Sequence, residues 1–265
     1  LRRHRRRPYR YPAMDLTDIR KLAHRLVQPY KITDGRKFRL KDYQPDDTGQ
    51  LKSEDKPRAQ EALEAGKAAL AQLQDMLYAQ DRWSVLLIFQ AMDAAGKDSA
   101  IKHVMSGINP QGCQVYSFKA PSAEELDHDW LWRCMRVFPE RGRIGVFNRS
   151  YYEEVLVVKV HPAILASEKL PPQVVGKKIW DERYASIRAI EKHMARSGTL
   201  VLKFFPNVSR DEQKRRFLLR IDQPDKNVTF AAGAAKPRAS DDDYTAAHPT
   251  PCRHVWRRAV TAFAG

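Results

Sequence analysis

Cysteine is scarce in this sequence of 265 residues. The three cysteines, Cys113, Cys134 and Cys252, lie far apart and share no spacing typical of metal ligands. A disulfide framework or a zinc site needs paired or clustered cysteines, so the sequence excludes both kinds of scaffold. A few unpaired thiols suit a reducing compartment, and we expect a cytoplasmic protein.

Long hydrophobic runs are absent as well. The longest purely apolar run extends from Val85 to Phe89, whereas a transmembrane helix needs ~20 such residues. Hydrophobic residues nevertheless make up 43% of the chain and charged residues 30%. This is the ordinary balance of a globular protein, so we expect a folded chain without a membrane segment.

Acidic residues are outnumbered by basic ones, 32 to 47, which gives a formal net charge of +15. Residues 1–13 contain six arginines and no acidic residue, but the rest of the chain is basic too. Such a chain often binds a polyanion, such as nucleic acid, an anionic membrane surface or a phosphate-rich substrate. Composition alone is equally compatible with a merely solvated basic surface.

The first residues differ in composition from the rest of the chain. Residues 1–13 form a basic extension without apolar periodicity, and the first methionine is Met14. The stretch lacks the serines of a transit peptide, so we attribute it to a misplaced start site and expect it to be disordered. Residues 14–56 are predicted to be an irregular N-terminal arm with one short helix over 16–26.

From residue 57 the sequence alternates between helical and strand patterns. The predicted helices cover residues 57–77, 97–106, 124–138 and 178–197, and the predicted strands cover 84–90, 113–118, 143–147 and 200–205. Strands that alternate with helices of this length indicate an α/β fold with a mostly parallel sheet. We assign residues 57–247 to this domain.

The segment after the first predicted strand resembles a phosphate-binding loop. Gly96 and Lys97 match the pattern GxxxxGK[ST], whereas Ala91 and Asp98 replace its first glycine and its hydroxyl residue. The free N–H groups and the dipole of a helix start bind anionic phosphate, and a lysine there adds charge while facing solvent. The residues predicted to bind phosphate are Ala94, Ala95, Gly96, Lys97 and Asp98. An ordinary strand–helix turn is the alternative.

Asp93 lies inside this loop. A carboxylate there would repel a bound phosphate unless a cation lay between them. Its presence therefore suggests Mg²⁺ that bridges carboxylate and phosphate oxygens, as in phosphoryl transfer generally. Alternatively, Asp93 is a surface turn residue.

A second polar cluster follows the strand predicted at 143–147. Because ligands gather at the carboxyl ends of parallel strands, we expect Asn148 and Arg149 beside the phosphate loop. Arg149 is suited to bind phosphate through two parallel hydrogen bonds. Glu153 and Glu154 are near enough in sequence to bind Mg²⁺ or accept a proton, unless they merely begin an exposed helix.

A third cluster follows the last predicted strand. Ser209 and Glu212 match a capping box, which predicts a helix start. A basic helix at this place suits a mobile lid, about residues 206–240, that closes over phosphates. The basic side chains predicted to bind phosphate are Lys214, Arg215, Arg216 and Arg220. A solvated charged helix is the alternative.

In this order, the three clusters resemble the motifs of the polyphosphate kinase 2 family. The similar segments are residues 90–112, 142–162 and 202–227, within a similarity from about Asp15 to Asn227. Asn148, with the Tyr-Glu-Glu-Val that begins at Tyr152, resembles the subgroup that phosphorylates both nucleoside mono- and diphosphates. The resemblance implies a three-layer P-loop kinase-like fold with a parallel sheet and a helical lid.

The same resemblance implies Mg²⁺-dependent phosphoryl transfer between inorganic polyphosphate and AMP, ADP or GDP. The residues implied in catalysis are Asp93, Lys97, Arg149 and Glu154, and those implied in metal binding are Asp93, Asn148, Glu153 and Glu154. A polyphosphate chain needs a long basic channel, which would account for the positive net charge of the protein. We expect polyphosphate and adenine or guanine nucleotides as partners, and a homodimer or homotetramer.

Two other functional classes stay open. An ATP-dependent nucleotide or small-molecule kinase would use the same fold. A nucleic-acid-binding protein, or an inactive remnant that only binds polyanions, would share the basic charge. Aromatic residues interleaved with basic ones for base stacking are not evident, which argues against nucleic acid.

The resemblance ends before the chain does. From His248 onward nothing matches the family pattern, so we expect residues 248–265 to form an atypical tail that lacks the family's last strand. A frame error or a truncated gene would give such a tail. A missing strand would leave the sheet, and the nucleotide pocket that it helps form, incomplete.

Overall fold

A six-stranded sheet forms the centre of the computed structural model, which describes residues 16–49, 51–221 and 260–264. The strands lie in the order β1-β6-β5-β2-β4-β3. Their bounds are Lys31–Ile32 for β1, Ser84–Phe89 for β2, Cys113–Ser117 for β3, Ile144–Asn148 for β4, Thr199–Asn207 for β5 and Val260–Ala264 for β6. The loop that follows β2 therefore leaves the interior of the sheet.

The strands from β3 to β6 pair in parallel, and β1 pairs antiparallel with β6. In register, Phe89 at the end of β2 lies between Asn148 of β4 and Phe204 of β5. The prediction of a parallel sheet from the four apolar runs is confirmed. Because parallel strands end on the same side, the segments after β2, β4 and β5 meet there.

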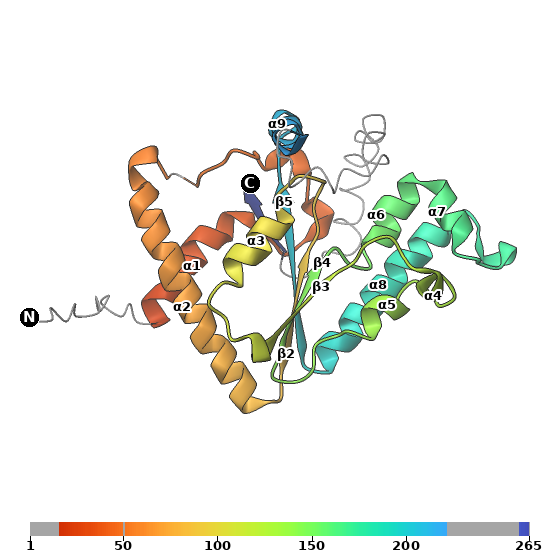
Figure 1. The fold of residues 1–265 in the computed structure, drawn as a ribbon, viewed down its shortest axis with the longest axis horizontal. Coiled ribbons are helices and arrows are strands. Elements are labelled where there is room, and N and C mark those ends of the chain that lie inside the picture. Colours follow the sequence, from red (N-terminus) through yellow and green to blue (C-terminus); the bar gives the residue numbers. More distant parts are fainter. Residues whose placement is uncertain (1–15, 50, 222–259, 265) are drawn as a thin grey trace, which may run out of the picture.

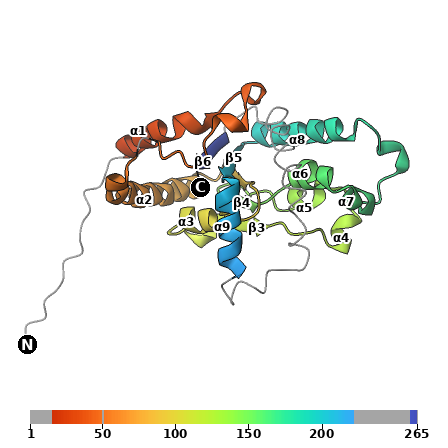
Figure 2. The same ribbon diagram turned by 90° about the horizontal axis from the view of Figure 1, so that it is seen from above.

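Helices cover both faces of the sheet, which gives three layers (Figures 1 and 2). One face carries α1 (Leu16–Val27), α2 (Lys56–Gln80) and α3 (Lys97–Val104), and the other carries α4 (Ala123–Leu126), α5 (Trp132–Met135), α6 (Glu153–Val160), α7 (Pro162–Ser167) and α8 (Ile179–Arg196). The last helix, α9 (Arg210–Ile221), follows β5 and lies over the ends of the strands (Figure 2). Short 3₁₀ turns cover Gln28–Tyr30, Gly35–Lys37, Leu40–Asp42, Ser53–Asp55, Pro110–Gly112 and Pro172–Val174.

β2 is buried on both faces because its side chains alternate between two cores. Leu86 and Ile88 belong to the larger core, which also includes Val155 and Leu156 of α6 and Tyr184, Ile187 and Met194 of α8. Leu87 and Phe89 belong to the smaller core, with Ile101 of α3. Each fully buried side chain of this kind contributes about 1.5–3 kcal/mol, so β2 fixes the loop that follows it at a rigid point. Within the described residues, no helix combines the length and apolar composition needed to cross a membrane.

The helix predicted over residues 124–138 is wrong as a single element. The chain forms α4, leaves the helix at Asp127 and starts again at α5. Asp129 stabilises the non-helical segment between α4 and α5, because its carboxylate accepts a hydrogen bond from the backbone N–H of Leu131 at 2.9 Å. An aspartate that binds a backbone N–H nearby offers the chain an alternative to the helix.

The tail, expected to be atypical, contributes a strand to the sheet. β6 pairs in parallel with β5, from Lys203 opposite Val260 to Asn207 opposite Ala264. The β-branched and aromatic residues of this segment suit a strand. Residues 222–259 of the lid and tail, and residues 1–13 of the basic extension, lie outside the described part of the chain.

Candidate active site

The loop between β2 and α3 turns through two left-handed residues. Ala94 has φ +59° and Gly96 has φ +90°, and α3 starts at the next residue, Lys97. Glycine adopts this conformation freely, whereas for Ala94 it costs of order 1 kcal/mol or more. The loop therefore directs the N-terminus of α3, with its free N–H groups, toward the carboxyl side of the sheet.

The expectation that Lys97 faces solvent is wrong, because its side chain turns back from the start of α3 onto the loop. Its side chain is buried, with 7% of the residue exposed. The ammonium donates hydrogen bonds to the carbonyl oxygens of Ala91 at 2.9 Å and Met92 at 3.1 Å. Burial lowers the pKa of Lys97, and the nearby carboxylate of Asp93 opposes this shift. The charge is thus fixed at the start of the loop by the loop's own backbone.

Arg149 connects the loop to the segment after β4. Its Nη2 lies 3.0 Å from Oδ1 of Asp93, and its Nη1 lies 3.6 Å from Oε2 of Glu153. Its backbone is left-handed, with φ +65°, and its N–H donates to the carbonyl of Phe89 at 3.0 Å. Strain of this kind persists only where the surroundings fix the conformation. The structure brings Asp93, Arg149 and Glu153 together, with the Asp93 carboxylate 62% exposed.

Asn148 and Asp98 also meet at this place. The amide nitrogen of Asn148 donates to Oδ1 of Asp98 at 2.5 Å and to Oγ of Ser117 at 3.4 Å. This contact joins the end of β4 to the first turn of α3. The amide group of Asn148 therefore has a structural partner in the described residues.

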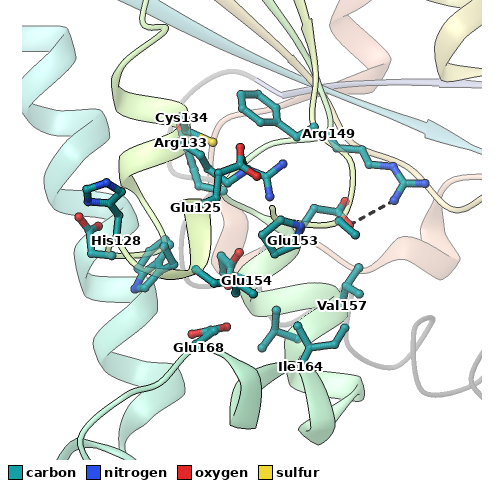
Figure 3. A pocket seen from close by; sticks show the side chains of 18 of the residues that line it. Glu125, His128, Arg133, Cys134, Arg149, Glu153, Glu154, Val157, Ile164 and Glu168 are labelled. Carbon is teal, nitrogen blue, oxygen red and sulfur yellow. Dashed lines mark ion pairs between the residues drawn. The ribbon is translucent and has the colours of Figure 1, made fainter. Parts of the chain in front are cut away.

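Glu153 and Glu154 point in different directions (Figure 3). Successive helical residues diverge by about 100°, so Glu153 turns to Arg149 while Glu154 lies beside Glu168. Glu154 accepts a hydrogen bond from Nη1 of Arg183 at 3.0 Å, and Glu168 pairs with the same guanidinium. The structure therefore does not bring Glu154 into the cluster around Asp93.

The two glutamates share one electrostatic trend. Burial raises the pKa of Glu153, against the opposing effect of Arg149. Burial also raises the pKa of Glu154, to about 8, and the neighbouring charge of Glu168 adds to the shift. The positive charge of Arg183 lowers the pKa of Glu154, but this one guanidinium pairs with two carboxyl groups, Glu154 and Glu168.

The basic helix α9 contacts the loop directly. Nε2 of Gln213 donates to the carbonyl of Asp93 at 3.0 Å, and Nη1 of Arg216 lies 3.3 Å from the carbonyl of Ala94. A Cβ atom at Gly96 would lie only 3.2 Å from Nη1 of Arg216. Glycine at this position therefore permits both the turn and the approach of the helix.

The start of α9 matches the predicted cap in part. Oγ of Ser209 accepts a hydrogen bond from the N–H of Glu212 at 3.2 Å. The Glu212 carboxylate pairs with Arg215 at 2.6 Å and Arg216 at 2.7 Å, which lowers the pKa of Glu212 to about 2. Lys214 and Arg215 are exposed. Arg220 is in the last turn of α9, and its side chain lies outside what the structure describes.

A cavity of 520 Å³ lies next to this cluster and was not predicted from the sequence. Its walls are the segment from Phe118 to Cys134, α6 and α7, and both Arg149 and Glu153 line it (Figure 3). Arg133 lies over the ring of Phe118, 5.3 Å from its centroid, and pairs with Glu125 at 3.4 Å. The dense aromatic and charged residues of this segment are the signal in the sequence for this cavity, but their spacing also fits a single amphipathic helix.

Carboxylates of the site do not form a metal cage. Among residues 16–49, 51–221 and 260–264, no group of three or more His, Cys, Asp or Glu side chains is placed to hold a metal ion. A metal at the loop would therefore take most of its ligands from a bound phosphate or from water.

Comparison with known proteins gives consistent matches. The family model described as polyphosphate kinase 2 matches residues 53–255. The chain is 58% identical over 196 residues to an ADP-polyphosphate phosphotransferase of Rhodopseudomonas palustris, covering 74% of this chain and 68% of that protein. It is 40% identical over 229 residues to an AMP/ADP-polyphosphate phosphotransferase of Meiothermus ruber, covering 86% and 81%. The fold resembles the crystal structure of polyphosphate kinase 2 from Arthrobacter aurescens, with a TM-score of 0.78 and 33% identity over 89% of this chain and 81% of that one.

Proposed function

The chain belongs to the polyphosphate kinase 2 family, and from this premise we propose that it transfers a phosphoryl group between inorganic polyphosphate and a nucleoside mono- or diphosphate. Relatives named for AMP, ADP and GDP acceptors support this reaction class. An ATP-dependent kinase on the same fold is less well supported, because the similar proteins are named for polyphosphate.

Arg149 supports the proposal most directly. Its guanidinium contacts Asp93 of the loop and also lines the 520 Å³ cavity. A cavity of this size lies in the range that holds small ligands. We place the nucleoside of the acceptor in the cavity, its terminal phosphate at Arg149, and polyphosphate along the loop and beneath α9.

Catalysis in this arrangement rests on position and charge. The transferred group carries spread negative charge in a loose transition state. Arg149, Lys97 and the N-terminus of α3 surround the point where the loop and the cavity meet, and Arg216 reaches the loop from α9. Charges already fixed in place stabilise such a transition state without reorganisation. Lys214 and Arg215 are exposed on α9 and suit the outer part of a polyphosphate chain.

We also propose that Mg²⁺ takes part in the reaction. The Asp93 carboxylate is exposed within the loop, and Mg²⁺ is commonly bound by one or two carboxylates together with substrate phosphates. When bound, the ion would neutralise charge on the phosphate oxygens. Asp93 fits this role. Glu153 pairs with the same guanidinium, Arg149, as Asp93 does and therefore lies near it. Glu154 pairs with Arg183 instead and does not fit.

Nucleotide turnover tests the proposal. Long-chain polyphosphate with AMP, ADP, GMP or GDP should yield the next higher phosphate, and removal of Mg²⁺ with a chelator should stop the reaction. ATP in place of polyphosphate should be a poor donor to AMP or GMP. Efficient transfer from ATP without any from polyphosphate would favour the ATP-dependent kinase. Binding of polyphosphate without turnover would favour an inactive remnant. The oligomeric state and the cytoplasmic location stay predictions.

A further inference from the structure

Behind the site lies Glu191, a largely buried carboxylate whose side chain is 13% exposed. Glu191 of α8 accepts three hydrogen bonds from three different side chains. Oε1 receives the hydroxyl of Tyr151 at 3.0 Å and that of Tyr152 at 2.7 Å. Oε2 receives the ammonium of Lys203, on β5, at 2.7 Å. The group joins the segment after β4, the helix α8 and the strand β5 at one point.

The two tyrosines connect this point to the site. They follow Arg149 and Ser150 directly and precede Glu153. Both are fully buried in the larger core, with ring centroids 5.2 Å apart. Their hydroxyls converge on one oxygen atom, which fixes the rotation of both rings. The N–H of Tyr152 also donates to Oγ of Ser150 at 3.2 Å, which closes the short turn between Arg149 and α6.

Buried charge at this point needs an explanation beyond packing. The Lys203 side chain is only 4% exposed and its partner carboxylate 13%. A buried ion pair is often no more stabilising than apolar side chains of the same size, because both charges lose their hydration. Such a pair instead fixes orientation, because three hydrogen bonds hold the carboxylate in one position and hold the three donor side chains with it.

We propose that Glu191 is a positioning residue for the phosphoryl transfer assigned above, and the inference therefore rests on that proposed function. Glu191 does not line the cavity or contact the loop residues. It holds the Tyr151 and Tyr152 hydroxyls, and through them it sets the backbone that presents Arg149 in its left-handed conformation and Glu153 at the cavity wall. Without this anchor, the segment keeps its apolar rings in the core but loses the fixed direction of Arg149.

Removal of the hydroxyls tests this role with little disturbance to the core. In the variant Tyr151→Phe/Tyr152→Phe, both rings stay in place while the hydroxyl bonds to Glu191 are lost. We expect the turnover number to fall by roughly tenfold or more, because small displacements of positioned groups cost this much. The KM for the nucleotide should change by less than about threefold, since Tyr151 lines the cavity but keeps its ring in the variant. The unfolding temperature should fall by only a few degrees.

Tyr116→Phe is the matched control. Its hydroxyl donates to Oε1 of Gln114 at 3.2 Å, on β3 and outside the Glu191 group. This variant should keep normal turnover. Wild-type turnover numbers in the folded double variant, or an equal loss in Tyr116→Phe, would overturn the positioning role while the proposed function stood. If the double variant does not fold, the single variant Tyr152→Phe is read in the same way.

Glu191→Gln and Glu191→Ala provide a second measurement. The amide oxygen introduced by Glu191→Gln can still accept the tyrosine hydroxyls, whereas alanine offers no acceptor. Turnover should therefore recover in Glu191→Gln relative to Glu191→Ala, even though both variants lose the charge pair with Lys203. Equal loss of turnover in the two variants would mean that the charge pair alone matters and would overturn the role of the tyrosine bonds. Absence of polyphosphate-dependent turnover in the wild-type protein would instead overturn the proposed function, and this inference with it.

Discussion

Nη2 of Arg149 lies 3.0 Å from Oδ1 of Asp93, so a side chain that follows β4 already pairs with the loop that follows β2. The pair is partly exposed, which makes it exchangeable: a phosphate can replace the carboxylate at the guanidinium, and a cation can replace the guanidinium at the carboxylate. This contact couples the loop to the cavity and makes both residues sensitive points of the site.

Arg149→Lys should lose turnover although it keeps the positive charge. Lysine cannot make the paired hydrogen bonds of a guanidinium to a phosphate. Loss of one preorganised donor to a transition state costs about 10²–10³-fold in turnover. Steady-state kinetics with polyphosphate and ADP will measure the loss, and Arg58→Lys, an exposed arginine on α2, is the control. Turnover within a few fold of wild type would contradict a transition-state role.

Asp93→Asn should lose most of its activity, and added Mg²⁺ should restore it only in part. The amide keeps the shape of the side chain but removes the charge that a cation needs. The measurement is the Mg²⁺ dependence of turnover, which should shift to higher concentration in the variant. Asp75→Asn, exposed on α2, should behave as wild type. An unchanged Mg²⁺ dependence in Asp93→Asn would mean that the carboxylate does not bind the ion.

Lys97→Ala should lose both activity and stability. The ammonium binds the carbonyls of Ala91 and Met92, and loss of hydrogen bonds from a charged group costs about 1.5–3 kcal/mol. Lys97→Met keeps most of the buried stem and should be more stable than Lys97→Ala, yet equally inactive. Chemical unfolding and turnover of both variants test this. Retained turnover in Lys97→Met would contradict a phosphate-binding role for the charge.

The sequence predicted the sheet well because the spacing of apolar residues, which marks buried strands and helices, can be read from short segments. The run at β2 is apolar from Val85 to Phe89, as a strand with two buried faces requires. It did not predict that Lys97 would turn back onto its own loop, since this depends on where the carbonyls of Ala91 and Met92 point. Nor did the sequence show that Glu153 and Glu154 point to different partners, because this depends on Arg183, which lies in a helix far along the sequence. The cavity arises from packing of three separate segments, and β6 from pairing with β5 far away in sequence.

Glu154 should make stability depend on pH. Its pKa is raised on folding to about 8, mainly by burial and then by Glu168. A folded state that binds the proton more tightly is favoured below the unfolded pKa of ~4.3, and this stabilisation is lost as the pH rises through about 8. The unfolding temperature of the wild type should therefore fall from about pH 6 to about pH 9.

Glu154→Gln should flatten this dependence, because the amide cannot titrate. Glu61→Gln, exposed on α2, should keep the wild-type curve. Burial raises the pKa of Glu153 as well, so some slope will remain in Glu154→Gln. Parallel curves for the wild type and Glu154→Gln would mean that Glu154 is ionised in the folded protein throughout this range.

The basic side chains of α9 should bind polyphosphate through salt-sensitive contacts. Lys214 and Arg215 are exposed, whereas Arg216 is half-buried against the loop and Glu212. Exposed charge pairs contribute only about 0.2–1 kcal/mol each, so Lys214→Ala or Arg215→Ala alone should have a mild effect. Arg216→Ala should have a larger one, because it also removes the contact with the carbonyl of Ala94.

The combined variant Lys214→Ala/Arg215→Ala/Arg216→Ala separates a polyphosphate site from a merely solvated basic helix. Its affinity for long polyphosphate should fall by between about threefold and a hundredfold, the sum of three such contacts. Ionic strength screens exposed charges over ~8–10 Å, so wild-type affinity should fall steeply with added salt and the variant should lose most of that slope. Binding of ADP should change less, because the cavity lies apart from α9.

The variant Arg58→Ala/Lys177→Ala/Lys178→Ala is the control, because it removes the same amount of positive charge from exposed positions elsewhere and should keep the wild-type salt dependence. Normal polyphosphate saturation in the α9 variant would mean that the donor binds elsewhere on the protein.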